Sequence, residues 1–123
     1  MKPQFKLYFW VLGLTAGLVW VTALSWPSAK LKLVFCDVGQ GDGILITLRS
    51  TQIVIDGGPG RQILDCLAHH MPFWDREIEL VVLTHPQADH LTGLLEVLPR
   101  YQVGKFITGP EGNETAGYRE LIK

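Results

Sequence analysis

The sequence predicts a layered α/β domain preceded by one N-terminal apolar helix. Strand patterns come first, over residues 30–55, and then alternate with helical patterns, an order that favours an α/β architecture. The 123 residues leave room for one small domain after the apolar stretch. We therefore divide the chain into residues 1–26, a membrane anchor or signal segment, residues 27–30, a linker, and residues 31–123, the domain.

The apolar stretch runs from Leu7 to Ser25 and contains 19 residues without a charge. A bilayer-spanning helix needs about 20 apolar residues. A cleaved signal peptide usually has a shorter apolar core, of about 7–15 residues, and remains an alternative, as does a buried core helix. A membrane anchor is the favoured interpretation.

Charge balance bears on orientation and on partners. Lys2 and Lys6 precede the stretch and Lys30 and Lys32 follow it, and with the α-amino group the bias favours a single pass with the domain on the extracytoplasmic side. From Pro27 onward the chain has nine basic and twelve acidic residues, a net charge of −3. This balance weighs against stand-alone binding of nucleic acid, which usually requires a basic face.

The first half of the domain reads as three strands. Residues 30–37 alternate polar and apolar side chains, which is typical of a half-exposed strand. A glycine-rich turn, residues 38–43, leads to strands expected at 44–48 and 52–55. Their short connections favour antiparallel pairing.

The second half alternates helices with strands. Residues 62–70 place Ile63, Leu64 and Leu67 on one helical face, and the nearly continuous apolar run at 79–84 is typical of a strand buried on both faces. The remaining elements expected are a helix at 91–98, a strand at 105–108 and a helix at 115–123.

The two cysteines lack the close spacing of a metal knuckle or a redox pair. We expect Cys36 and Cys66 to be two buried small apolar residues. A disulfide is the alternative if the domain faces an oxidising compartment.

The segment after the apolar strand carries the candidate chemistry. His85, Asp89 and His90 supply two imidazoles and a carboxylate within six residues. These are ligand types that zinc and similar divalent metals prefer, and ligands of α/β folds gather at the carboxyl ends of strands. We expect a loop that turns the three side chains toward one centre. Alternatively, Asp89 caps the following helix and the histidines are solvated.

Three segments in this order resemble the metallo-β-lactamase superfamily. They read FCDVGQGDGILI, IVIDGG and LVVLTHPQADHLTGL, and the resemblance covers residues 31–110. More closely, they resemble the hydrolase domain of ComEC/Rec2-type competence proteins, with a D-V-G-Q-G-D turn, a D-x-G after the third strand and a T/S-H-P-x-x-D-H loop. The resemblance implies that residues 31–123 are the first half of an αβ/βα sandwich.

The resemblance also implies a divalent metal, zinc or alternatively manganese, as one or two ions. His85 would ligate the first ion. Asp89 and His90 would ligate the second, with Asp89 also acting in catalysis by orienting the attacking water. Gln87 stands where the superfamily has another histidine, and an amide oxygen is the poorer ligand, so a single ion is the alternative.

Other polar residues are weaker candidates for the metal site. The resemblance gives Asp56 a supporting role, through hydrogen bonds to the metal segment, with a simple turn residue as the alternative. It marks Asp37, Gln40 and Asp42 as signature residues, although turn formation explains them equally well. Outside the resemblance, His69 and His70 suit the C-terminus of the helix at 62–70 by their charge.

The superfamily's further ligands, two histidines and often an aspartate, lie well downstream, and no histidine or aspartate follows His90 here. We therefore expect a truncated domain that needs its missing C-terminal half or a completing partner. The resemblance implies hydrolysis of DNA phosphodiesters during DNA uptake at the cell surface. The alternative is an inactive, membrane-tethered fragment with a structural or partner-binding role.

Overall fold

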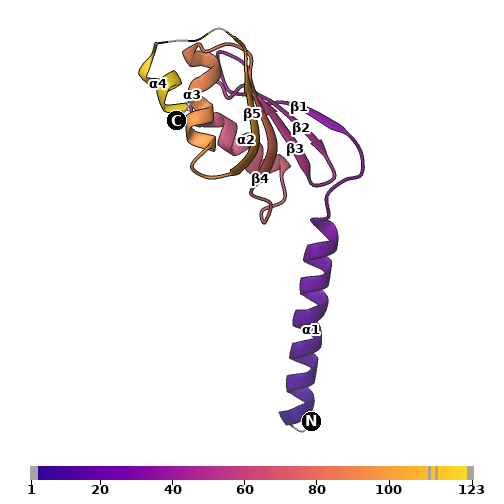
Figure 1. Cartoon of the computed structure of the whole chain (residues 1–123). Helices are drawn as coiled ribbons and strands as arrows, with labels where there is room; N and C mark the ends of the chain where they lie inside the picture. Colours follow the sequence, from indigo (N-terminus) through magenta and orange to yellow (C-terminus); the bar gives the residue numbers. More distant parts are fainter. Residues whose placement is uncertain (1–2, 111, 113, 122–123) are drawn as a thin grey trace.

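The computed structural model describes residues 3–110, 112 and 114–121, as one long helix followed by an α/β domain (Figure 1). Helix α1, Pro3–Leu24, extends away from the domain, as the apolar pattern predicts. Its segment Gln4–Leu24 is long and apolar enough to cross a membrane, and none of it is buried by the rest of the chain. A helix of 22 residues is about 33 Å long, close to the thickness of a bilayer's hydrocarbon core.

The domain is built on one five-stranded mixed sheet whose strands follow chain order. The first two pairings are antiparallel and the last two are parallel. Because parallel neighbours need a crossover, helices separate the later strands. The elements are β1 Lys32–Phe35, β2 Ile44–Leu48, β3 Thr51–Ile55, α2 Gln62–His70, β4 Glu77–Leu83, α3 Ala88–Val97, β5 Gln102–Thr108 and α4 Ala116–Leu121.

This arrangement confirms the predicted α/β class. The helix at 62–70 and the strand at 44–48 have the expected bounds. Helix α3 begins at Ala88, three residues before the expected start, and β5 begins at Gln102. The end of the helix expected at 115–123 lies partly outside the described residues.

One face of the sheet packs against the helices and forms the core. A row of residues in register crosses all five strands on this face: Val34, Leu45, Val54, Val81 and Phe106. The three central members are fully buried, and each contributes about 1.5–3 kcal/mol of hydrophobic stabilisation. Ile63 and Leu67 of α2 and Leu94 of α3 complete the same cluster.

The opposite face of the sheet is apolar but uncovered by any described helix. The adjacent residue on each strand, toward the carboxyl end of the sheet, forms its row, because side chains alternate between faces. The row is Phe35, Ile44, Ile55, Val82 and Ile107. Phe35 and Ile107 at its two ends are 72% and 52% exposed. We call this surface the open face.

The two ends of the sheet differ. At the carboxyl end, β3 and β4 finish side by side at Ile55 and Leu83. At the other end, which we call the anchor end, the chain enters from α1. There the backbone N–H of Arg49 donates to the carbonyl of Ser28 at 2.9 Å and attaches the linker to the β2–β3 turn. The seven residues of β4 separate the two ends by about 20 Å.

The expectation for the cysteines was wrong. Cys36 and Cys66 form a disulfide, with Cα atoms 5.7 Å apart. Both residues are partly exposed, and the bond joins the end of β1 to α2. Their separation of 30 residues hid the pairing, because it depends on how α2 packs back beside β1.

Candidate metal centre

Asp56 is the centre of a hydrogen-bond cluster at the carboxyl end of the sheet. It directly follows β3, has a left-handed backbone (φ 58°) and is 1% exposed. Its Oδ1 accepts a bond from the backbone N–H of Thr84 at 2.8 Å, and its Oδ2 accepts from the Thr84 hydroxyl at 2.6 Å. Both oxygens of this buried carboxylate are therefore partnered, as burial requires.

His90 joins the same carboxylate from α3. Its Nδ1 lies 3.0 Å from Asp56 Oδ2, and the ring is largely buried. Because an ionised carboxylate can only accept, Nδ1 carries the proton in this contact. The lone pair of the neutral ring is then on Nε2, the atom left for another ligand.

His85 is assigned the same tautomer as His90, through its contact with Thr84. The Thr84 hydroxyl has one proton, which it donates to Asp56, so toward His85 Nδ1, at 3.0 Å, it acts as acceptor. His85 Nδ1 therefore carries a proton and Nε2 has the lone pair. The His85 and His90 rings lie with their centroids 3.8 Å apart. One buried carboxylate thus fixes the tautomers of two neighbouring imidazoles.

Two further carboxylates border this pair of rings. Asp89 Oδ2 lies 3.7 Å from His90 Nε2. Asp42 Oδ2 lies 3.9 Å from His90 Nδ1, and its side chain is 70% exposed. Asp42, Asp56 and His90 have ligand atoms within 4.8 Å of one another and could hold a metal ion. Since Asp56 is fully partnered, we assign it to supporting His90 and treat Asp42 and Asp89 as the available carboxylates.

Glycines allow the three segments of the centre to approach one another closely. A Cβ on Gly93 would lie 1.8 Å from the carbonyl oxygen of Gly57, and one on Gly41 would lie 2.1 Å from that of Asp89. Backbone bonds run through the same contacts, from Gly57 N–H to the His90 carbonyl at 2.7 Å and from Gly93 N–H to the Gly58 carbonyl at 2.9 Å. The glycine-rich turn, the segment after β3 and helix α3 therefore form one packed unit.

His85 and Asp89 each lie beside His90, but the group of ligand atoms within 4.8 Å of one another includes neither of them, and the expected loop is only partly present. Asp89 and His90 lie in the first turn of α3. The alternative role for Asp89 as helix cap is also wrong: Gln87 is the cap residue, and it makes no side-chain cap bond. The backbone between Leu83 and Gln87 makes the turn that delivers His85, and the carbonyl of His85 accepts from Gln87 N–H at 2.9 Å.

The polar residues in and beside the glycine-rich turn have different roles. Asp37 Oδ1 accepts from the N–H of Gly39 at 3.4 Å, which fits a turn-forming role, whereas Asp42 faces His90. Gln40 is exposed. Our reading of the sequence missed Thr84, although the T/S before His85 was the available signal.

His69 and His70 form the last turn of α2, as their sequence position predicts. They lie at the anchor end, away from this centre, where they line a cavity.

Comparisons with known proteins find likenesses among solved structures. No family model matches the chain, and no curated protein matches it. Among solved structures, the chain is similar to Rm3 metallo-beta-lactamase, at 26% identity over 66% of this chain, with a TM-score of 0.44. The match spans 33% of that chain, and a TM-score at this level carries no argument about function.

Proposed function

We propose that the domain belongs to a metal-dependent hydrolase of metallo-β-lactamase fold, of the ComEC/Rec2 type, and acts on DNA phosphodiesters at the cell surface. The observation that carries the metal-dependent part is the bonding of Asp56. It orders Thr84 and His90 directly and His85 through Thr84. The lone pairs of both Nε2 atoms are then available to bind a metal. Such carboxylate support of metal-binding histidines is a recurring feature of metal centres.

The donor set fits a divalent metal. Two neutral imidazoles and the carboxylate of Asp89 are ligands that zinc accepts, with manganese as the alternative. When bound, the ion would supply Lewis-acid activation of a water and of the scissile group. His85 and His90 would hold it, and Asp89 would ligate it and orient the attacking water. Asp42 lies on the Nδ1 side of His90, away from the Nε2 atom that would bind this ion.

The open face supports a second layer above the sheet. Its row of Phe35, Ile44, Ile55, Val82 and Ile107 crosses every strand and leaves large apolar side chains in contact with water. An apolar face of this extent marks a binding surface in a soluble domain. We propose that the remaining half of an αβ/βα sandwich, or a partner in its place, covers this face and adds metal ligands.

The proposed location is extracytoplasmic, with α1 as a single-pass anchor. Helix α1 has the necessary length and apolarity, and the Cys36–Cys66 disulfide favours an oxidising compartment. The assignment of DNA as substrate rests on the resemblance of the three sequence segments alone. A domain net charge of −3 offers no general attraction for phosphates, so DNA binding would depend on the metal or on the second layer.

The full chain, purified in detergent with zinc or manganese, provides the test. Calorimetric titration should detect metal binding that His90→Ala weakens at least tenfold, whereas the matched His69→Ala variant at the anchor end should bind as the parent does. Equal affinity in the parent and His90→Ala would contradict the proposed centre.

Hydrolysis of bis-p-nitrophenyl phosphate tests the activity separately. We expect little turnover from this chain and metal-dependent turnover when downstream sequence is added. Efficient turnover by the chain alone, abolished by His90→Ala, would show that no second layer is needed. Metal binding without turnover in the extended protein would favour the alternative, an inactive membrane-tethered fragment.

A further inference from the structure

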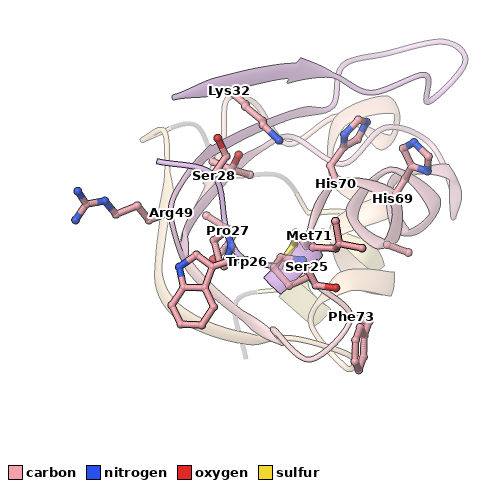
Figure 2. A pocket seen from close by; sticks show the side chains of 15 residues that line it. Ser25, Trp26, Pro27, Ser28, Lys32, Arg49, His69, His70, Met71 and Phe73 are labelled. Carbon is pink, nitrogen blue, oxygen red and sulfur yellow. The ribbon is translucent and has the colours of Figure 1, made fainter. Parts of the chain in front are cut away.

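A cavity of about 360 Å³ lies at the anchor end, where α1 meets the domain. It is lined by the end of α1 and the linker, by the start of β1, by β3 and by the last turn of α2 (Figure 2). We call it the basal cavity. If α1 spans a bilayer, the cavity lies at the membrane surface, because Leu24 and Trp26 line it.

The basal cavity is cationic. Lys32, Arg49, His69 and His70 line it, and no Asp or Glu does so among the residues that the structure describes. Burial, then the neighbouring His69 and Lys32, lower the pKa of His70, so these basic groups lie close enough to repel one another. Figure 2 shows the side chains of Lys32 and His70 at the cavity while Arg49 extends away from it. The side chains of Lys32 and His70 therefore favour an anion in the cavity, whereas Asp75 and Glu79 are bonded to Gln52 and do not line it.

Gln52, one of the residues that line the cavity, has a buried acceptor without a partner among the described residues. Gln52 is 1% exposed, and its Nε2 donates to Asp75 Oδ2 at 2.9 Å, which fixes the amide orientation. Its Oε1 is buried and has no hydrogen-bond partner among the described residues. A buried acceptor left unsatisfied costs about 1–3 kcal/mol, so this atom favours a ligand that brings a donor.

Exposed aromatic side chains surround the same end of the domain. Phe73 and Trp74, in the connection from α2 to β4, are 71% and 45% exposed. Their ring centroids are 4.9 Å apart. Trp26, just after α1, is 77% exposed. Figure 1 shows the α2–β4 connection projecting from the sheet on the side where α1 ends. Aromatic side chains favour the interface between lipid and water.

We infer that the anchor end rests on the bilayer, with Phe73 and Trp74 in the lipid interface and an anionic phospholipid headgroup in the basal cavity. The lipid phosphate would lie near Lys32 and His70, at the mouth of the cavity that Gln52 also lines. This inference rests on the proposal that α1 spans the membrane. It places the candidate metal centre about 20 Å above the lipid surface, facing away from it.

Depth measurement on the full chain tests the contact. Variants Phe73→Cys and Arg61→Cys, spin-labelled with the native disulfide intact, are inserted into vesicles of phosphatidylcholine and phosphatidylglycerol. The first label should be accessible to oxygen and protected from a water-soluble nickel complex. The second, at the exposed start of α2, should show the reverse. Extraction of the chain by alkaline carbonate would refute the anchor, whereas an inserted chain with both labels in water would refute the docking alone.

Lipid retention tests the headgroup site. Native mass spectrometry of the detergent-purified chain should show phosphatidylglycerol retained, and Lys32→Gln should reduce this retention about fivefold, as expected for one cation at an anionic lipid. The matched Lys105→Gln, exposed on β5 and outside the cavity, should leave retention unchanged. Equal retention in the two variants would contradict a specific site.

Discussion

Two buried polar residues at opposite ends of the sheet, Asp56 and Gln52, differ in how far their oxygens are hydrogen-bonded. At the carboxyl end, Asp56 is buried and both of its oxygens are occupied by Thr84 and His90. At the anchor end, Gln52 is equally buried but leaves one oxygen without a partner among the described residues, in a residue that lines the basal cavity. The polar groups around Asp56 are therefore preorganised from within the domain, whereas Gln52 keeps an acceptor that the domain does not satisfy.

The difference extends to how each end is encoded. The carboxyl end draws its polar groups from three short motifs, each just after a strand, and these motifs, through the family resemblance, predicted a metal centre at His85, Asp89 and His90. The basal cavity draws Lys32, Gln52, His70 and Phe73 from separate elements with no motif. Only the fold brings them together, so no pattern along the chain could predict that cavity.

The largest expected effect is a steric break of the carboxyl end. In Gly93→Ala, the new Cβ would lie 1.8 Å from the Gly57 carbonyl oxygen, a backbone atom that cannot easily move. We expect a loss of about 3 kcal/mol in the free energy of unfolding, measured by urea denaturation in detergent. The matched change is Gly60→Ala, whose Cβ would meet only the flexible end of Gln62 and should cost little. Equal stability of the two variants would contradict close packing of α3 on the segment after β3.

Next is the disulfide, which connects β1 to α2 just before the glycine-rich turn. Replacing both Cys36 and Cys66 by Ser should lower the free energy of unfolding by about 2–4 kcal/mol, because the crosslink restricts the unfolded chain. Denaturation with and without reductant provides the measurement: the parent should lose stability on reduction, and the double variant should not respond. A parent that is indifferent to reductant would show that the bond does not form.

Matched Asp→Asn changes at Asp56 and Asp75 compare the two ends of the sheet by their effect on zinc affinity. Asp56→Asn keeps the shape but puts an NH₂ group where an acceptor is needed, so one contact with Thr84 or His90 is lost. We expect zinc affinity to fall about 10–100-fold in calorimetric titration. Asp75→Asn, the equivalent change beside Gln52 at the anchor end, should not alter zinc affinity. Loss in both variants would mean a general loss of structure rather than a supporting role for Asp56.

Much of the fold was predictable because hydrophobic periodicity reports burial directly. Residues 44–48 and 62–70 had their bounds set by abrupt changes of pattern at a glycine-rich turn and at Pro72. The start of α3 was misplaced because Ala88 and Asp89 carry no apolar periodicity, although they begin the helix. The tautomers of His85 and His90 and the disulfide depend on contacts over long sequence separations, which local pattern does not encode.

The smallest expected effect is at His70. Its pKa is lowered, first by burial and then by His69 on the same helix and Lys32 on β1, so the unfolded chain binds its proton more readily than the folded one. Stability contributed by this group therefore rises with pH and is lost as pH falls through and below the ordinary value of 6.5. Asp37 and Asp65, which line a neighbouring groove with His70, do not reverse the direction.

Because His70 is mostly exposed, the effect should stay within about 0.5 kcal/mol. Urea denaturation in neutral detergent between about pH 5 and 8 should show a flatter acid limb for His70→Gln than for the parent. Adding phosphatidylglycerol should flatten the parent's acid limb in the same way, because an anion in the basal cavity offsets the repulsion from Lys32. A lipid response that persists unchanged in Lys32→Gln would place the anion elsewhere.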